Sequence, residues 1–301
     1  YTEVGFSRIS VNPSLSIIYK LNYAWRFTVH ASYKERYGEM TDLYDRPYQT
    51  DYRNSVWNCG ILPVYRQQLY SVYGEYKNTA REFFATVNLT HNREWYNRIY
   101  EQRIENGQIQ RVSLPLSNHG SGYTVKSTLS KGFYDLGLKT SLLALLNISK
   151  AEQISGGQRL PYQYRLMRLE PTVIWTPNRH WETSYQTDIR YGGSKIGERT
   201  RLAPLWNVTQ QVQLSYIFSP IEASLSVDHY HNDVNEDQSV NAVFADFSVL
   251  WKSQRLQITA TATNLFDKRT YGYTRYASLE SYTSWVRIRP REFLVAIRYQ
   301  L

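Results

Sequence analysis

The sequence predicts an all-β fold and, within that class, a transmembrane antiparallel up-and-down β-barrel. Three observations support this prediction: apolar and polar residues alternate in one stretch after another, short and long connections alternate between the stretches, and aromatic residues flank the short connections. Alternate residues of a strand point to the same face of a sheet, so each stretch has one apolar and one polar face. A soluble β-sandwich shares this periodicity, and the other two observations therefore decide between the two folds.

The first part of the chain contains five predicted strands. Apolar residues occupy alternate positions near 15–21, 27–33, 70–76, 83–95 and 123–129. The fourth of these is expected to continue past Trp95 to a hairpin tip at Asn106 and Gly107, because Asn-Gly between extended segments favours a type I′ turn. Residues 4–10 are a further candidate strand.

The rest of the chain adds eight strands, which gives 13 in all, or 14 with residues 4–10. They lie near 136–148, 169–175, 181–191, 212–216, 221–227, 243–251, 256–262 and 293–301. In the clearest of them, Trp181, Tyr185 and Ile189 alternate with Glu182 and Asp188. The last one places its apolar side chains on one face to the end of the chain, at Phe293, Val295, Ile297, Tyr299 and Leu301.

The connections between these strands are of two kinds. Short ones are expected at 22–25, 77–80, 132–135, 176–180, 217–220 and 252–254. Long polar ones are expected at 38–63, 99–119, 150–162, 192–205, 232–242 and 265–290. Outer-membrane barrels have short turns at one end and long loops at the other, whereas Greek-key sandwiches do not sort their connections in this way.

Aromatic residues recur beside the short connections. They are Tyr23, Trp25, Tyr76, Phe83, Phe133, Tyr134, Trp175, Trp181, Tyr216, Phe218 and Trp251. Tyr and Trp favour the boundary between lipid and water, so this recurrence predicts an aromatic girdle at one level of the barrel.

Composition agrees with a barrel and excludes several other classes. The mean hydropathy is -0.53, and the longest aliphatic run, 142–146, is far shorter than the roughly 20 residues of a membrane-spanning helix. The chain has 27 Tyr and 8 Trp but only 1 Cys, which excludes a disulfide framework and a four-cysteine zinc site. Its net charge of +9 is scattered, with no basic run, so we expect no nucleic-acid partner.

No motif points to catalysis, so we expect no enzyme activity, no cofactor and no metal. Glu182, Asp188 and Arg190 share a strand face and could form an acid and base pair, but we interpret them as lumen-facing residues bonded to neighbouring strands or to a plug. His229 and His231, beside Asp228 and Asp233, could bind a metal but have no evident third ligand.

The last long connection is the candidate ligand-binding segment. Aromatic side chains stack on rings and Arg pairs with carboxylates, and this segment is rich in both. The candidate residues are Tyr271, Tyr273, Arg275, Tyr276, Trp285 and Arg287. The alternative is that the segment packs through its own aromatic residues as a lid over the lumen.

A short motif gives the chain a family resemblance. Asn264, Leu265, Phe266 and Asp267, followed by Lys268, resemble the signature of TonB-dependent outer-membrane receptors, one strand before the last. In that family a tyrosine-rich loop, a Pro-Arg pair and an alternating last strand follow, and here these are the loop up to Pro290 and Arg291 and the strand that comes next. The tyrosine-rich style is most similar to receptors of Bacteroidetes-like bacteria.

The resemblance implies a barrel of about 22 strands with an N-terminal plug and a Ton box. The chain has neither, so we expect residues 1–301 to be one barrel domain that is incomplete at its N-terminus; a self-standing barrel of 14 strands is the alternative. The implied function is nutrient uptake across the bacterial outer membrane. The implied partners are outer-membrane lipid, a small-molecule, glycan or peptide nutrient, the inner-membrane TonB complex through the missing N-terminal region, and a surface lipoprotein. A passive porin or channel and a non-transporting adhesin or structural barrel remain as alternatives.

Overall fold

The computed structural model describes residues 9–105, 108–197, 200–235, 237–277 and 280–300. Within these ranges the chain forms β-strands and two short 3₁₀ helices, η1 (Met40–Leu43) and η2 (Tyr134–Leu136). No helix in the described part is both long enough and apolar enough to cross a membrane.

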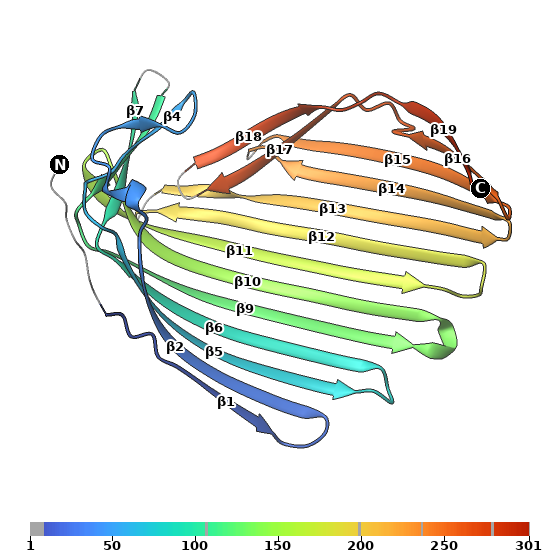
Figure 1. Cartoon of the computed structure of the whole chain (residues 1–301), viewed down its shortest axis with the longest axis horizontal. Coiled ribbons are helices and arrows are strands. Elements are labelled where there is room, and N and C mark those ends of the chain that lie inside the picture. Colours follow the sequence, from blue (N-terminus) through green and yellow to red (C-terminus); the bar gives the residue numbers. More distant parts are fainter. Residues whose placement is uncertain (1–8, 106–107, 198–199, 236, 278–279, 301) are drawn as a thin grey trace.

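One large antiparallel sheet dominates the structure (Figure 1). It has 17 strands, of which β3, β4, β7 and β8 lie at one end and the other thirteen form a continuous wall. In spatial order the wall contains β1 (Ser14–Lys20), β2 (Trp25–Tyr37), β5 (Val64–Asn78), β6 (Phe83–Tyr96), β9 (Asn118–Phe133), β10 (Leu138–Ser155), β11 (Gln158–Trp175), β12 (Trp181–Ile196), β13 (Thr200–Phe218), β14 (Ile221–Asp233), β15 (Ser239–Lys252), β16 (Leu256–Thr263) and β19 (Glu292–Tyr299).

These strands confirm the all-β, up-and-down prediction and each of the thirteen predicted strands. The sheet is not closed: among the described residues, β1 and β19 are its two edges. Of the candidate strand at residues 4–10, residues 4–8 lie outside the described residues, and Ile9 and Ser10 are not in a strand.

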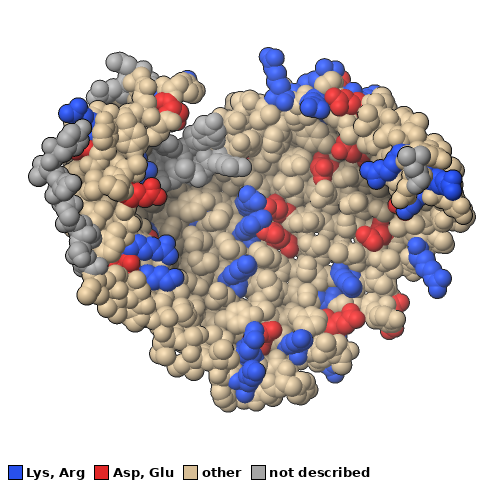
Figure 2. All heavy atoms as spheres, viewed as in Figure 1, with Lys and Arg blue, Asp and Glu red and all other residues tan. Residues whose placement is uncertain are grey.

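The register keeps apolar residues on one face across the whole wall. Val72 of β5 lies opposite Val29 on one side and Leu89 on the other, and Leu89 in turn lies opposite Val125. At the far edge, Ala260 of β16 lies between two apolar residues, Val249 of β15 and Val295 of β19. We call this side the apolar face and the opposite side the polar face. Figure 2 shows Lys, Arg, Asp and Glu side chains inside the hollow of the molecule.

The apolar face is not covered by other protein. Val72, Leu89 and Leu129 are 47%, 48% and 41% exposed although each is in the middle of a strand. The buried apolar side chains of the described residues are few: Ile99, Val112, Ile154, Leu205, Ala242 and Ala245. A soluble sheet of this size would bury its apolar face in a core, so the wall needs an apolar surrounding instead.

Short turns lie at one end of the wall, as predicted, and the other end carries the long segments. We call this second end the long-loop end. The lengths predicted there are wrong for the connections at 150–162 and 192–205, where the strands continue much further, while the connection predicted at 232–242 is shorter by a few residues. β10 and β11 stay paired up to Ser155 and Gln158, with only Gly156 and Gly157 between them. Strand pairing persists there because backbone hydrogen bonds do not require an apolar face.

The Asn264 motif forms a tight corner after β16. Asn264 and Asp267 both have positive φ angles, of 49° and 50°. The buried Asn264 amide donates to the carbonyls of Lys268 (2.8 Å) and Arg289 (2.9 Å), and its oxygen accepts from the backbone N–H of Lys268 (3.0 Å). Asp267 accepts from Arg269 and from the backbone N–H of Arg291, and these bonds hold the pKa of its carboxyl below the usual value. The motif therefore joins the two ends of a long excursion, β17 (Thr270–Ala277) and β18 (Glu280–Arg287), to the wall.

Replacing Asn264 tests this corner. We expect Asn264→Ala to lower the free energy of unfolding by about 3 kcal/mol, because it removes three hydrogen bonds and places an alanine at positive φ. Asn264→Gly removes the same bonds without the backbone strain and is expected to cost about 1 kcal/mol less. Urea unfolding in detergent micelles measures both. Equal stability of Asn264→Ala and the native protein would contradict the structural role of the corner.

Candidate ligand-binding site

Four short strands of the large sheet stand apart from the wall at the long-loop end. They are β3 (Tyr48–Gln49), β4 (Asn54–Trp57), β7 (Ile99–Glu105) and β8 (Gln108–Leu114). β4 pairs with β8 in parallel, β8 pairs with β7, and β7 pairs in parallel with Ile154 and Ser155 of β10. We call residues 38–63 together with β7 and β8 the canopy. The tip predicted at Asn106 and Gly107 lies outside the described residues, but Glu105 and Gln108 on either side of it are paired, as a hairpin requires.

The canopy has its own small core and polar anchors. Ile99 of β7 is 0% exposed, and Val112 of β8 and Ile154 of β10 are also buried. Arg98 donates to Asp42 of η1 across 2.8 Å, and both side chains are largely buried. Asn97 accepts from the backbone N–H of Val64 and donates to the carbonyl of Leu62. Asn97 and Arg98, which connect β6 to β7, thereby hold the segment 38–63 in place.

A cavity of about 770 Å³ lies between the canopy and the ends of β6, β9, β10 and β11. Its size is that of a site for a small organic ligand, which is typically 300–1,000 Å³. The lining combines phenol rings, guanidinium groups, carboxylates and amides. The side chains most able to bind a ligand are those of Asn92, Glu94, Tyr96, Arg98, Tyr100, Gln102, Arg111, Asn118 and Tyr162.

Two guanidinium groups flank one phenol ring in this cavity. The Cζ atom of Arg111 is 3.7 Å from the centroid of the Tyr100 ring, and that of Arg98 is 5.0 Å from it. Burial raises the pKa of the Tyr100 phenol, and the two positive charges oppose that rise. The group therefore offers an aromatic face and fixed positive charge side by side, which suits a ligand with a ring and an anionic group.

A hydrogen-bonded carboxylate forms the opposite side of the lining. Glu94 accepts from the Tyr96 hydroxyl (2.9 Å), from the Asn92 amide (2.8 Å) and from the Gln67 amide (3.2 Å). Burial, and then the charge of Glu94, raises the pKa of Tyr65 to about 12 and raises that of Tyr96 as well. Both phenols consequently keep their protons at neutral pH and act as hydrogen-bond donors.

The predicted ligand-binding residues occupy a different place. They lie on the β17–β18 hairpin, which contacts β12, β14 and β15. The Tyr271 hydroxyl accepts a hydrogen bond from Asn232 (2.8 Å), and its ring packs edge-on against Tyr230 and Phe244 of the wall. Tyr271 thus anchors the hairpin to the polar face.

The other predicted residues of the hairpin differ in their surroundings. The Tyr273 ring lies beside that of Tyr271, with centroids 6.0 Å apart. Trp285 is 62% exposed and covers Gly272, where an added Cβ would come within 2.7 Å of the indole ring. Arg287 is exposed at the end of β18. The side chains of Arg275 and Tyr276 lie outside those described, although their backbone belongs to β17. None of the four described side chains lines the cavity.

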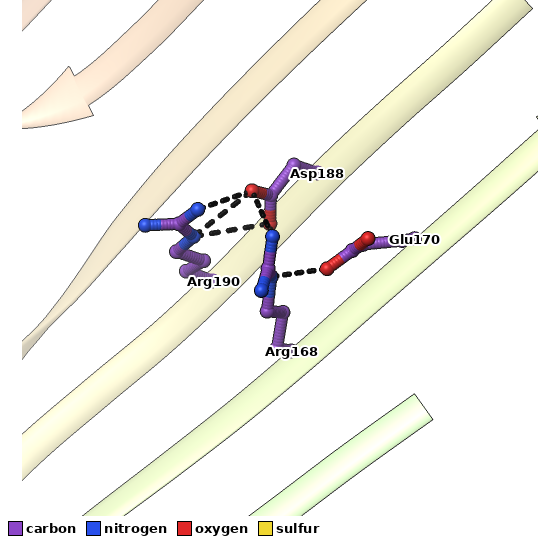
Figure 3. A network of polar contacts seen from close by, with 4 residues as sticks. All are labelled: Arg168, Glu170, Asp188 and Arg190. Carbon is purple, nitrogen blue, oxygen red and sulfur yellow. Dashed lines mark hydrogen bonds and ion pairs between the residues drawn. The ribbon is translucent and has the colours of Figure 1, made fainter. Parts of the chain in front are cut away.

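The charged residues predicted on one strand face form part of a network on the polar face (Figure 3). Arg168 of β11 binds Asp188 of β12 through two hydrogen bonds of 3.0 Å and also pairs with Glu170. Arg190 donates to the same carboxylate at 2.5 Å. The Asp188 carboxylate accepts hydrogen bonds from two guanidinium groups, so it joins strands and is not a free general base. Glu182 takes no part in the network drawn in Figure 3.

The two histidines of β14 do not assemble a metal site. Within the described residues, no group of three or more His, Cys, Asp and Glu side chains is placed to hold a metal ion. His231 instead contacts Asn241 (2.9 Å) and Asp233 (3.3 Å).

The comparison with known proteins gives structural likeness only. No protein-family model and no curated protein matches the chain. Among solved structures it is similar to FpvA of P. aeruginosa, in a pyoverdine–iron complex, with 10% identity and a TM-score of 0.49 over 95% of this chain and 44% of that one. It is similar to FyuA of Yersinia pestis, a ferric yersiniabactin uptake receptor, with 8% identity and a TM-score of 0.44 over 96% and 50%. It is also similar to the Pseudomonas putida toluene transporter TodX, with 12% identity and a TM-score of 0.28 over 97% and 83%.

The chain therefore spans half or less of the length of FpvA and FyuA. These two neighbours are TonB-dependent receptors, the family that the Asn264 motif resembles, and the neighbours are bacterial outer-membrane barrels. At such identities and TM-scores the likeness carries no argument about ligand or mechanism, which must come from the residues of this chain.

The Arg98–Asp42 pair gives a test of how the canopy is held. We expect Asp42→Ala to leave Arg98 without its partner and to speed amide hydrogen exchange at Ile99 and Val112 by about tenfold or more, since breaking a largely buried pair costs more than about 1.4 kcal/mol. Hydrogen exchange read by mass spectrometry measures this. Asp45→Ala, in the same segment, is the control and is expected to leave exchange unchanged. Equal exchange in both variants would show that the pair does not hold the canopy.

Proposed function

We propose that the chain forms part of the wall of an outer-membrane β-barrel transporter of the TonB-dependent receptor type, which captures a nutrient at its long-loop end. One observation carries the membrane assignment: in the middle of the wall, charge is confined to the polar face. The polar face carries charged residues along the wall strands: Arg26, Glu75, Lys126, Arg168, Glu170, Glu182, Asp188, Arg190, Glu222, Asp228, Asp246 and Arg298.

The apolar face has a band without such charges. It begins next to the short turns, where Lys131 lies, and ends near Arg93 and Arg165. On β6 it extends from Phe83 to Arg93. Ten residues at about 3.4 Å each, tilted by about 40°, span about 26 Å, close to the roughly 25 Å apolar band of outer-membrane barrels. The band therefore fits the hydrocarbon layer of a membrane.

Aromatic side chains at the lower margin of this band support the same placement. Trp25 packs on Tyr76, which packs on Phe83, and Trp181 packs on Tyr216. These residues come from neighbouring strands beside the short turns, where a girdle at the inner membrane boundary would lie. With the short turns on the periplasmic side, the canopy and its cavity face the cell exterior.

The cavity supports the assignment of a receptor. Arg98 and Arg111 around Tyr100, with the amides and phenols opposite, match a polar organic nutrient that has a ring and at least one anionic group. Binding and passage of such a molecule require no covalent chemistry, so the protein acts without enzyme activity. The family resemblance of the Asn264 corner supports the further proposal that the inner-membrane TonB complex drives uptake and that a surface lipoprotein assists capture.

Lysine substitutions on the two faces test the membrane placement. We expect Val212→Lys, on the apolar face between Tyr185 and Val227, to lower the free energy of unfolding by about 2–4 kcal/mol in lipid. Gln211→Lys, next to it on the polar face, lies opposite Asp228 and is expected to change stability by less than about 1 kcal/mol. Urea unfolding of each variant in phosphatidylcholine vesicles gives both values. Similar costs at the two positions would contradict a lipid-facing apolar side.

Ligand-binding measurements distinguish the cavity from the hairpin. A thermal-shift screen of siderophores, oligosaccharides, peptides and vitamins identifies a ligand, whose Kd is then measured for each variant. We expect Tyr100→Ala and Arg111→Ala to weaken binding by about tenfold or more, because each removes a charged or aromatic contact. The double variant Trp285→Ala with Arg287→Ala is expected to bind normally. The reverse result would return ligand capture to the hairpin.

A further inference from the structure

A group of basic residues lies on the apolar face just beyond the charge-free band. Lys150 of β10 and Lys195 of β12 both lie opposite Gln163, which is on the strand between them. Arg165 is two residues along β11 from Gln163 and on the same face, opposite Ile148 and Gly193. We call Lys150, Arg165 and Lys195 the basic triad.

The register gives the triad its dimensions. Strands are about 4.8 Å apart, so Lys150 and Lys195, two strands apart, have backbones about 10 Å from each other. Arg165 is the diagonal neighbour of both, at about 7–8 Å. Long Lys and Arg side chains at these spacings can converge on one group of atomic size, such as a phosphate.

The triad has no acidic partner among the described residues. Lys150 and Arg165 are exposed and Lys195 is half-buried, and none of them forms an ion pair or side-chain hydrogen bond within that part of the chain. The nearest acid on this face by register, Glu152, already binds Arg159 (3.1 Å) and lies near His119 (3.8 Å). Three neighbouring cations without a counter-charge repel one another, so an anion would stabilise the site.

A hollow adjoins the triad. It has a volume of about 320 Å³, and Lys150, Gln163 and Lys195 are among its lining residues. Lys150 also lines the ligand cavity. However, the strand register places its side chain on the face opposite that of Tyr162, which faces the cavity. The triad is therefore a second site, on the outer side of the wall.

Stacked rings border the apolar band on the strands next to the triad. His91 lies between Tyr70 and Tyr123, with ring centroids 6.5 Å and 4.3 Å away and nearly parallel planes. One ring nitrogen of His91 contacts the carbonyl of Gly122 at 3.0 Å, and the other accepts from Arg93 at 3.2 Å. This bond holds Arg93, which is two residues beyond His91 toward the long-loop end and in the same row of the sheet as Lys150.

We propose that the basic triad binds the phosphate group of a phosphorylated lipid in the leaflet that surrounds the long-loop end of the barrel. This inference rests on the proposed membrane placement. A lipid fits better than a soluble anion because the triad opens onto the apolar band: its acyl chains would lie along Ile148, Tyr123 and Leu146, while its headgroup meets the three cations. The basic triad would then select, by its headgroup, the one lipid that binds at this position of the wall.

Lipid selectivity measured by electron spin resonance tests the proposal. The protein is reconstituted in dioleoylphosphatidylcholine vesicles that contain a trace of spin-labelled phosphatidic acid or spin-labelled phosphatidylcholine. The fraction of motionally restricted label gives the relative association constant. We expect preference for phosphatidic acid in the native protein and a loss of about tenfold in the triple variant Lys150→Gln, Arg165→Gln and Lys195→Gln.

The matched control removes three lysines from the polar face, as Lys34→Gln, Lys126→Gln and Lys139→Gln, and is expected to keep the preference. Loss of preference in the control to the same degree, or its retention in the triad variant, would overturn the proposal. Displacement of the labelled phosphatidic acid by equimolar inorganic phosphate would identify a site for the soluble ion instead.

The same experiment separates this inference from the proposed function. Restricted phosphatidylcholine without any preference for phosphatidic acid would overturn the lipid site alone and leave the membrane placement intact. The absence of restricted lipid of either kind would overturn both. Restricted phosphatidylcholine in the triad variant also shows that this variant has folded and inserted.

Discussion

Backbone pairing in a fixed register is the constraint on which the structure depends. Each wall strand must satisfy its N–H and C=O groups through its neighbours, and a slip of one residue would exchange its two faces. The rows that cross the wall show how strictly this is kept: Val29, Val72, Leu89 and Val125 come from four strands and lie in one line. The same register places Arg168, Asp188 and Arg190 together on the other side. Faces, ion pairs and the position of the cavity all follow from it.

Much of this architecture could be predicted from the sequence because its period is local. Strands and short turns were predictable, since alternation over 5–8 residues is visible along the chain. The position of the Asn264 motif could be predicted from the sequence, but its role as a hydrogen-bonded corner could not. That role depends on the Asn264 side chain, which bonds to the carbonyls of Lys268 and Arg289, two residues that are 21 positions apart. The lengths of the β10–β11 and β12–β13 hairpins were missed because polar strands beyond a membrane have no apolar signal.

The cavity could not be predicted for a different reason. Its lining comes from β4, β6, β7, β8, β9, β10 and β11, and its defining contacts join residues without any periodic relation, such as Arg98 with Asp42. The alternation of Tyr96, Arg98 and Tyr100 was a local signal, and it lay beyond Trp95, where the strand was expected to continue to the tip at Asn106 and Gly107. The tyrosine-rich hairpin has the composition of a binding segment because aromatic and basic residues are dense there, yet Tyr271 uses its ring and hydroxyl to attach the hairpin to β14 and β15.

The parallel pairing of β4 with β8 has a consequence for the order of assembly. A hairpin closes between strands adjacent in sequence, but Asn54 meets Ile109 only after the intervening β5, β6 and β7 have been positioned. The pairing of Glu101 with Ile154 likewise requires β9 and β10 to be in place. Contacts between such distant residues form late, because loop-closure entropy must first be overcome. The cavity is thus a product of completed folding, and a partly assembled wall has its apolar face before it has the cavity.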